Sequence, residues 1–570
     1  METQVREAHC YRPYRRRHNQ RVEFRCRFSV LIFCLLIIIL FFPSNADCLL
    51  ANPYWQVSAD YSARQEDALQ KGLIALRENR LEAALEELTT AEHEHPADPR
   101  VHNFRGIVLA RLGQNAEAAA EYREAIRIDP RMEDAYRNLG FLEWTEHQLI
   151  GAREDLERAL ELSPDDSFAH YYLGRVQLDA QLYALAFEEL ERSHVPWPTD
   201  PEFLIQAATG YLALGRQEKT RETLDQLAPS LLNDKQSIQV APLMLAVREN
   251  ERAIDLLENL INRPRADAGP WAQFDLALAY LLSGSYGKAA DQAHSYIGMR
   301  RTSGSEPGET APAWSLIGIA YARLGQGDQA VDALRQAATL APGQEEHWLN
   351  LTRELMELSR YADAISAVQN GLTSNAKSYS LHLRLGAANL SAGRYAEAES
   401  VFRNLVLAGD PLSTSYIGLA QVLLRTGRAE EASSELAAAR QKLGPNFLIS
   451  YFRGLALDRA GKPSEAISAY QEALRLNPSS AEAHLGLGKT DLALARLSDA
   501  TTELEETLRL SPGNVQARRL LSQAYQRAGD TKRAVKYAET ATDPPPAAEG
   551  DLLGDFVLPQ WQRPPECKRQ

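Results

Sequence analysis

One stretch of the chain decides its fold: residues 311–344 read APAWSLIGIAYARLGQGDQAVDALRQAATLAPGQ. Small residues stand at fixed places in it, with Gly318 at position 8, Gly325 at position 15 and Ala330 at position 20. Small side chains at positions 8 and 20 would let two helices cross closely. Gly325 would end the first helix in the left-handed conformation, and Pro342 would end the second. The stretch therefore predicts a hairpin of two helices.

The same spacing returns along the chain. A Gly that follows Leu or Ile, as in Leu139-Gly140 and Leu487-Gly488, is followed twelve residues later by Ala, here Ala152 and Ala500. Residues 99–132 and 447–480 match the whole pattern nearly as well as residues 311–344. This 34-residue pattern resembles the tetratricopeptide repeat, which has bulky residues at positions 4, 11 and 24 and Pro at position 32.

The resemblance implies an all-α fold, an α-solenoid in which about fourteen tetratricopeptide-like hairpins wind into a right-handed superhelix. One hairpin cannot bury its bulky residues alone, so copies must stack. Counting in this frame places the starts of the repeats near residues 65, 99, 133, 167, 201, 234, 270, 311, 345, 379, 413, 447, 481 and 515. The repeats from 201 and 234 depart from the pattern, with Thr220 in place of Ala and Arg248 in place of Gly, which leaves open whether they are true repeats.

Residues 304–310 (GSEPGET) interrupt the frame and predict a flexible loop. The loop either divides the array into a first block, 65–303, and a second block, 311–548, or is a tolerated surface insertion. The tail, 549–570, carries apolar residues such as Phe556 and Trp561. We expect it to cap the last repeat, and a peptide that docks on a partner is the alternative.

Residues 1–46 have the layout of an export signal, since eight Arg against three Glu precede an apolar run at 28–42. Fifteen helical residues reach about 22 Å, less than the roughly 30 Å of a bilayer core. This length favours a cleaved signal peptide over a signal anchor, which stays open. In both cases a linker at 47–64 follows, and the repeats lie outside the cytoplasm, periplasmic or anchored to the membrane by this segment alone.

The composition excludes several classes of partner and cofactor. The net charge is −14 although the leader is basic, so the rest of the chain is acidic and nucleic acid is not expected as a partner. Beyond the leader only Cys48 and Cys567 remain, which excludes a disulfide framework and a four-cysteine zinc site. His170, His382 and His484 fall at position 4, where a packing role is expected. We predict no metal and no cofactor.

The sequence also lacks a catalytic motif. Gly488-Lys489-Thr490 ends like a phosphate-binding loop, but Ala483 stands where that loop needs its first Gly. Neither a His-Glu-x-x-His zinc motif nor a Gly-x-Ser-x-Gly elbow is present. The chain is therefore predicted not to be an enzyme.

The resemblance implies that positions 2, 5, 9 and 12 of each first helix line a concave groove in which extended proteins or peptides bind. These positions give a set of aromatic and Arg residues in the repeats from 133 and 167, namely Arg137, Phe141, Trp144, Phe168, Tyr171 and Arg175, and a smaller set, Trp271 and Phe274, in the repeat from 270. Aromatic and Arg side chains make good interface anchors, and an acidic or aromatic peptide would suit them. Alternatively, the rings fill gaps between hairpins.

Leader, array and missing catalytic motifs together predict an exported scaffold or adaptor for protein–protein or protein–peptide interactions. Assembly of envelope, secretion or polysaccharide-export machinery is the expected setting. The alternative is a substrate-positioning subunit of an enzyme complex whose active site lies on a partner.

Overall fold

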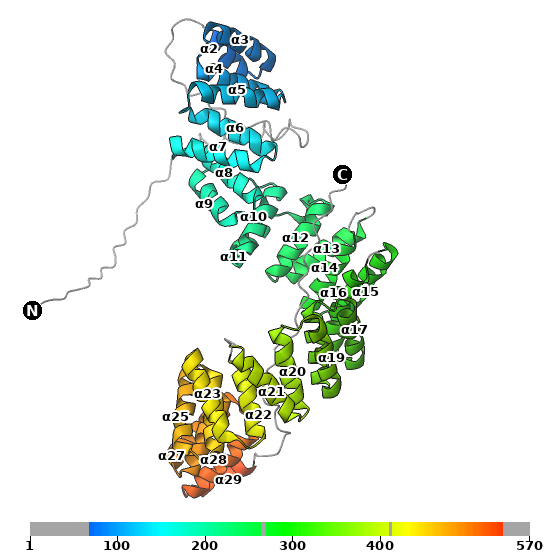
Figure 1. Cartoon of the computed structure of the whole chain (residues 1–570), viewed down its shortest axis with the longest axis vertical. Helices are drawn as coiled ribbons and strands as arrows, with labels where there is room; N and C mark the ends of the chain where they lie inside the picture. The colour runs from blue at the N-terminus through cyan, green and yellow to red at the C-terminus, as the bar shows by residue number, and fades with distance from the viewer. Residues whose placement is uncertain (1–67, 264–268, 305, 410–412, 540–570) are drawn as a thin grey trace, which may run out of the picture. The chain divides into compact units, whose positions relative to one another are not determined.

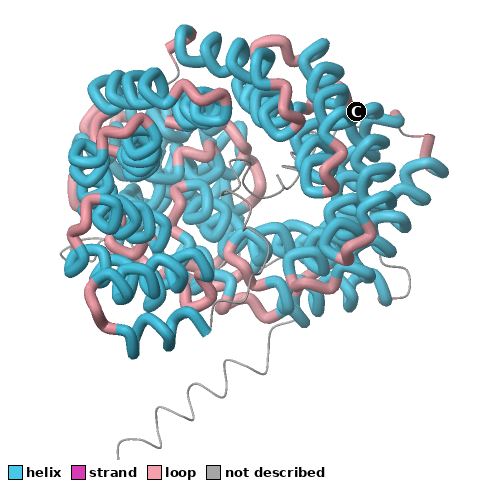
Figure 2. The backbone as a smooth tube through the Cα atoms, turned by 90° about the horizontal axis from the view of Figure 1, so that it is seen from below, coloured by secondary structure: helices cyan, strands magenta, loops and turns pink. Residues whose placement is uncertain are grey.

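The computed structural model describes residues 68–263, 269–304, 306–409 and 413–539. These residues form 28 α-helices, two short 3-10 helices and no strand. Figure 1 shows the two helices of a hairpin side by side, and Figure 2 shows only helices and the loops that join them in the described residues. The predicted all-α class is confirmed.

The helices pair into fourteen hairpins, which fall into two compact units that divide between Pro196 and Trp197. The first compact unit holds α2 (Ala68–Arg77) with α3 (Leu81–Glu94), α4 (Pro99–Arg111) with α5 (Asn115–Ile128), α6 (Glu133–Thr145) with α7 (Leu149–Leu162), and α8 (Ser167–Asp179) with α9 (Tyr183–Ser193). The second holds α10 (Pro201–Ala213) with α11 (Gln217–Leu224), α12 (Asp234–Ala246) with α13 (Asn250–Asn262), α14 (Gly269–Leu282) with α15 (Tyr286–Thr302), α16 (Ala311–Arg323) with α17 (Gly327–Leu340), α18 (Glu345–Glu357) with α19 (Tyr361–Ser374), α20 (Tyr379–Ser391) with α21 (Tyr395–Leu407), α22 (Thr414–Arg425) with α23 (Ala429–Leu443), α24 (Phe447–Arg459) with α25 (Pro463–Leu476), α26 (Ala481–Ala493) with α27 (Leu497–Leu510), and α28 (Val515–Arg527) with α29 (Thr531–Glu539).

Several predicted segments lie outside the described residues: the leader, the linker at 47–64 and the tail at 549–570. Two 3-10 helices join hairpins, η1 (Pro229–Leu231) and η2 (Pro307–Thr310), and η2 falls in the predicted loop at 304–310. The division of the array into blocks at this loop stays a prediction.

The turn inside every hairpin has the same backbone conformation. All fourteen residues at position 15 have a positive φ, between 56° and 82°, and eight of them are Gly. Six are not: Asn79, His147, Gln181, Arg248, Ser359 and Ala495. The repeat thus requires the left-handed conformation even at residues whose Cβ atom makes that conformation sterically unfavourable.

The bulky residue at position 24 packs against small residues of its own hairpin and of the next one. A Cβ atom on Gly386, in α20, would lie 2.7 Å from the ring of Phe402 in α21, and one on Gly418, in the next hairpin, would lie 2.4 Å from the same ring. Phe402 is completely buried. This side chain therefore joins two repeats, and no larger residue fits at either Gly.

The two irregular repeats, from 201 and 234, also form hairpins. Thr220 is completely buried at position 20, and its hydroxyl donates to the carbonyl of Arg216 at 3.1 Å, which satisfies the added polar group. Asn233 and Gln236 form a capping box at the start of α12, so this helix has a strong local start signal although Pro242 lies inside it.

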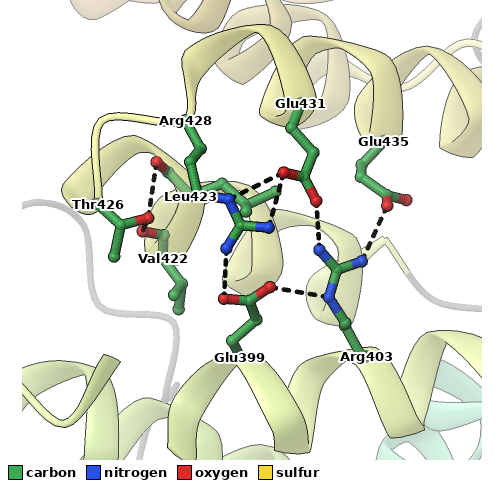
Figure 3. Close-up of polar contacts among 8 residues, drawn as sticks. All are labelled: Glu399, Arg403, Val422, Leu423, Thr426, Arg428, Glu431 and Glu435. Atoms are coloured by element: carbon green, nitrogen blue, oxygen red, sulfur yellow. Dashed lines mark hydrogen bonds and ion pairs between the residues drawn. The ribbon is translucent and has the colours of Figure 1, made fainter. Parts of the chain in front are cut away.

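A network of two Arg and three Glu joins α21 to α23, the second helices of neighbouring hairpins (Figure 3). Arg403 binds Glu399 at 2.9 Å and Glu435 at 3.1 Å, and also binds Glu431. Arg428 binds Glu399 and Glu431, each at 2.7 Å. Because the side chains share partners, ordering one of them lowers the entropic cost of ordering the next.

Candidate functional site

Five side chains gather where α6 and α8, the first helices of neighbouring hairpins, contact each other. We call them the Trp144 cluster: Phe141, Trp144, Tyr171, Tyr172 and Arg175. The ring centroids of Phe141 and Tyr172 are 4.6 Å apart, and those of Phe141 and Trp144 are 6.0 Å apart. Tyr171 meets Tyr172 edge to face at 5.6 Å. The predicted groove positions of these two helices are therefore brought together.

Arg175 covers the cluster. Its guanidinium carbon lies 5.1 Å from the centroid of the Trp144 ring, and its Nη1 donates to the hydroxyl of Tyr171 at 3.1 Å. The indole Nε1 of Trp144 donates to Asp179 at 2.6 Å. Cation–π contact and hydrogen bonds thus fix the orientation of both aromatic rings.

The cluster is partly core and partly surface. Phe141, Trp144 and Tyr171 are each half-buried and pack against a core that includes Leu156. Phe168, which was predicted with them, lies outside the cluster and is half-buried against the same core. Tyr172 is buried. The rings therefore fill the gap between two hairpins, and each half-buried ring still exposes an edge or face to solvent.

Arg137 has a different environment from the one predicted for it. It binds Asp134 of its own helix and Asp166, the residue that caps the N-terminus of α8. Burial alone would lower the pKa of Arg137, but the two carboxylates more than offset it and leave the pKa above its usual value. Arg137 therefore joins α6 to α8, and Arg175 supplies the positive charge of the cluster.

The second predicted set lies in the other compact unit. Phe274 is only 1% exposed and packs on Tyr296 of α15 at 5.4 Å, so Phe274 belongs to the core. Burial raises the pKa of Tyr296 to about 12. Trp271 is half-buried, 5.6 Å from Tyr296, and carries Arg300 over its ring at 5.2 Å. Only Trp271 of this pair offers a surface.

Sequence reasoning missed Tyr172 and Asp179 because they stand at positions 6 and 13, outside the positions assigned to the groove. Asp179 could have been predicted to lie beside the cluster, because residues four apart share one helix face and Asp179 follows Arg175 by four residues.

No three His, Cys, Asp or Glu side chains come together as metal ligands would, within the residues that the structure describes. Within the same residues, every helix is too short or too polar to cross a bilayer. The predicted apolar run at 28–42 lies outside them.

Comparison with known proteins identifies the class of these hairpins. Models of the tetratricopeptide repeat match residues 69–133, 147–201, 311–344, 349–414, 417–481, 459–509 and 485–549. The chain belongs to the tetratricopeptide repeat family, whose arrays are typically non-catalytic scaffolds for protein–protein interaction.

Individual relatives are distant. Cellulose synthase 1 operon protein C of Komagataeibacter xylinus is 26% identical over 237 residues, which are 39% of this chain and 18% of that protein. Among solved structures, yeast Tom70 is 14% identical with a TM-score of 0.37 and coverage of 82% of this chain and 96% of that one. A tetratricopeptide protein of Thermus thermophilus is 22% identical with a TM-score of 0.29, covering 32% of this chain and 100% of that one.

Proposed function

We propose that this chain is an exported scaffold that binds an extended peptide of a partner protein at the Trp144 cluster. The observation that carries the proposal is the position of Arg175, which lies over Trp144 and bonds Tyr171 while all three side chains keep part of their surface exposed. A cationic, aromatic surface of this kind favours a peptide with acidic or aromatic side chains.

The setting is proposed to be the bacterial envelope, in secretion or polysaccharide export. Two observations support it: the basic and apolar layout of residues 1–46, and the similarity to the Komagataeibacter xylinus protein, which is a cellulose synthase operon protein. The repeats would then be periplasmic or held at the membrane by the leader.

Photocrosslinking in cells tests the binding surface. A photoreactive phenylalanine analogue at Tyr171 should capture a defined partner, because this half-buried ring lies beside Arg175. The same analogue at Tyr395, a 36% exposed ring of the second compact unit, is the matched control. Arg175→Glu should remove the product, while Arg127→Glu, on an exposed side chain of α5, should leave it.

The identity of the captured protein separates the scaffold from its alternative. Structural envelope proteins support the proposed function, and a single stoichiometric enzyme supports a substrate-positioning subunit. Capture of the same proteins at Tyr171 and Tyr395 would show that the Trp144 cluster is not the binding surface.

A further inference from the structure

The side chain at position 4 repeatedly binds the carbonyl oxygen of the Pro that ends the preceding repeat. The Nε2 atoms of three histidines reach such carbonyls: His102 that of Pro96 at 3.4 Å, His170 that of Pro164 at 2.9 Å, and His484 that of Pro478 at 3.1 Å. At two other junctions the donor is an indole or a guanidinium: Trp348 binds Pro342 at 3.0 Å, and Arg518 binds Pro512. The Pro carbonyl at position 32 thus accepts a hydrogen bond from an imidazole, an indole or a guanidinium, depending on the repeat.

Each of the three histidines also has a partner on the second helix of its own hairpin. Each Nδ1 lies within hydrogen-bond distance of a Glu at position 23, on the second helix of the same hairpin. The distances are 2.8 Å for His102 to Glu121, 2.5 Å for His170 to Glu189 and 2.5 Å for His484 to Glu503. We call each Pro–His–Glu set a histidine clamp. It links the end of one repeat to both helices of the next.

Both partners of each imidazole are acceptors, since a carbonyl has no proton and an ionised carboxylate has none to give. A neutral imidazole has one N–H and can serve only one of them. The side chains of His102, His170 and His484 are 7%, 11% and 13% exposed, so water cannot readily replace a lost partner. We propose that all three clamps are closed by a doubly protonated imidazole, which makes these junctions loosen as pH rises from about 6 to 8.

The charged groups around the three clamps differ, so the clamps should differ in how strongly they loosen as pH rises. Glu121 is shared with Arg105, whose Nη1 lies 3.1 Å away, and Arg105 also binds Glu92 of α3. Glu124 of α5 acts on His102 through its charge. The His102 clamp therefore has a competing cation and a long bond to Pro96, and should respond least.

The other two clamps have weaker competition for the carboxylate. Arg192 of α9 lies 3.4 Å from Glu189 by its Nη1, and Arg192 binds Glu188 more closely, at 2.6 Å. Around His484 the facing groups are acidic: Glu503, and also Glu506 of α27, which pairs with Arg509.

Asp491 of α26 adds a further acidic group near Glu503, and it also faces Asp499 and Arg496, whose Nη1 lies 3.8 Å away. Negative surroundings favour the charged imidazole, so the His484 clamp should respond strongly, as should the His170 clamp.

The sign follows from proton binding. A closed clamp holds a proton that an unfolded or open histidine gives up as pH rises through the range in which histidine ordinarily titrates. The closed form therefore binds more protons than the open form. Its stabilising contribution is present at pH 6 and is lost toward pH 8. Because Asp166 lies in the loop after Pro164 and binds Arg137, opening of the His170 clamp would also disturb the α6–α8 contact.

Hydrogen exchange of the full-length chain at pH 6 and pH 8, scaled for intrinsic exchange rates, tests the proposal. Protection of α8 and α9 should fall roughly tenfold in the wild type, as expected for loss of one charge-assisted hydrogen bond. In His170→Gln the fall should be smaller by this factor. This comparison also removes the effect of other titrating groups of the first compact unit, which the variant retains.

His382 provides the matched control. It stands at the same position 4, but its Nδ1 binds the carbonyl of Ser378 in its own helix start at 2.7 Å, and Val401 occupies its position 23. His382→Gln should leave the fall at α8 and α9 unchanged. The junction at Trp348 should show no pH-dependent fall in any variant.

An equal fall in the wild type and in His170→Gln, or no fall in the wild type, overturns the proposal. Should His170→Gln not fold, NMR of the ¹⁵N-labelled wild type decides: at pH 7.5 three of the twelve histidines should show both ring nitrogens protonated. Neutral imidazoles throughout would also overturn it.

Discussion

Arg175 on α8 lies over the indole of Trp144 on α6, with its guanidinium carbon 5.1 Å from the ring centroid. The same indole donates its Nε1 proton to Asp179, one turn beyond Arg175 on α8. Trp144 is thus held by two groups of the neighbouring hairpin. The contact joins two repeats and orders an aromatic face, and this order would lower the entropic cost of binding the proposed peptide.

The bond between Trp144 and Asp179 should contribute measurably to the stability of the α6–α8 contact. Trp144→Phe and Asp179→Asn should each destabilise α8, and the double variant should cost less than the sum by about 1 kcal/mol, the usual net worth of such a bond. The opening free energy of α8 from hydrogen exchange measures this coupling. Strictly additive costs would show that the bond contributes nothing.

Gly386→Ala should destabilise the hairpin of α20 and α21. A Cβ atom there would lie 2.7 Å from the buried ring of Phe402, so the ring or the helix must move, at a cost of roughly 1–3 kcal/mol. Gly343→Ala is the control, because no heavy atom would lie within 4 Å of its Cβ. Urea unfolding compares the two, and Gly386→Ala with Phe402→Leu should regain part of the loss.

Ala495→Gly should stabilise the hairpin of α26 and α27. Ala495 has a φ of 57°, a conformation that costs an L-residue about 1–2 kcal/mol, while the added freedom of Gly in the unfolded chain takes back about half. A net gain of about 0.5–1 kcal/mol is expected. The converse change, Gly461→Ala at φ 73°, should destabilise the preceding hairpin by a similar amount. Gains or losses of the same sign at both positions would contradict this account.

The array could be predicted from the sequence because its period rests on sterics. Gly at positions 8 and 15 and Ala at position 20 are required by close helix approach and by the turn, so they recur. Where these residues are missing, as at Arg248, the period alone does not show whether the segment is a true repeat. The hairpin of α12 and α13 forms there because neighbouring repeats bury its apolar face, a tertiary effect that a single repeat does not encode.

The candidate site was predictable only in part. The resemblance to the tetratricopeptide repeat assigned Phe141, Trp144, Tyr171 and Arg175 to one face of the first helices, and the structure brings these side chains together. The repeat pattern does not determine which carboxylate each Arg binds. In the structure Arg137 binds Asp134 and Asp166. Nor could the pattern show that Tyr296 would cover Phe274, because the depth of a side chain depends on packing by the second helix.

Burial and the nearby charge of Glu143 raise the pKa of Asp155 on α7 to about 7. Glu143 accepts a bond from Arg123 at 2.9 Å, and its carboxylate lies so close to Gly151 that a Cβ atom there would be 2.3 Å away. The folded chain therefore keeps a proton on Asp155 over a pH range in which the unfolded chain has lost it.

Stability of the first compact unit should consequently fall as pH rises from about 4, the ordinary value for Asp, to about 7, and should level off above that. Asp155→Asn removes this proton and its penalty. The free energy of unfolding of the variant should therefore rise relative to that of the wild type across that range, and the variant should be the more stable protein at pH 8. Thermal unfolding at intervals between pH 5 and 8 measures the difference, with Asp165→Asn on an exposed loop as the control. Parallel curves for wild type and Asp155→Asn would mean that Asp155 ionises in the folded chain as readily as it does in the unfolded one, and that Glu143 does not act on it.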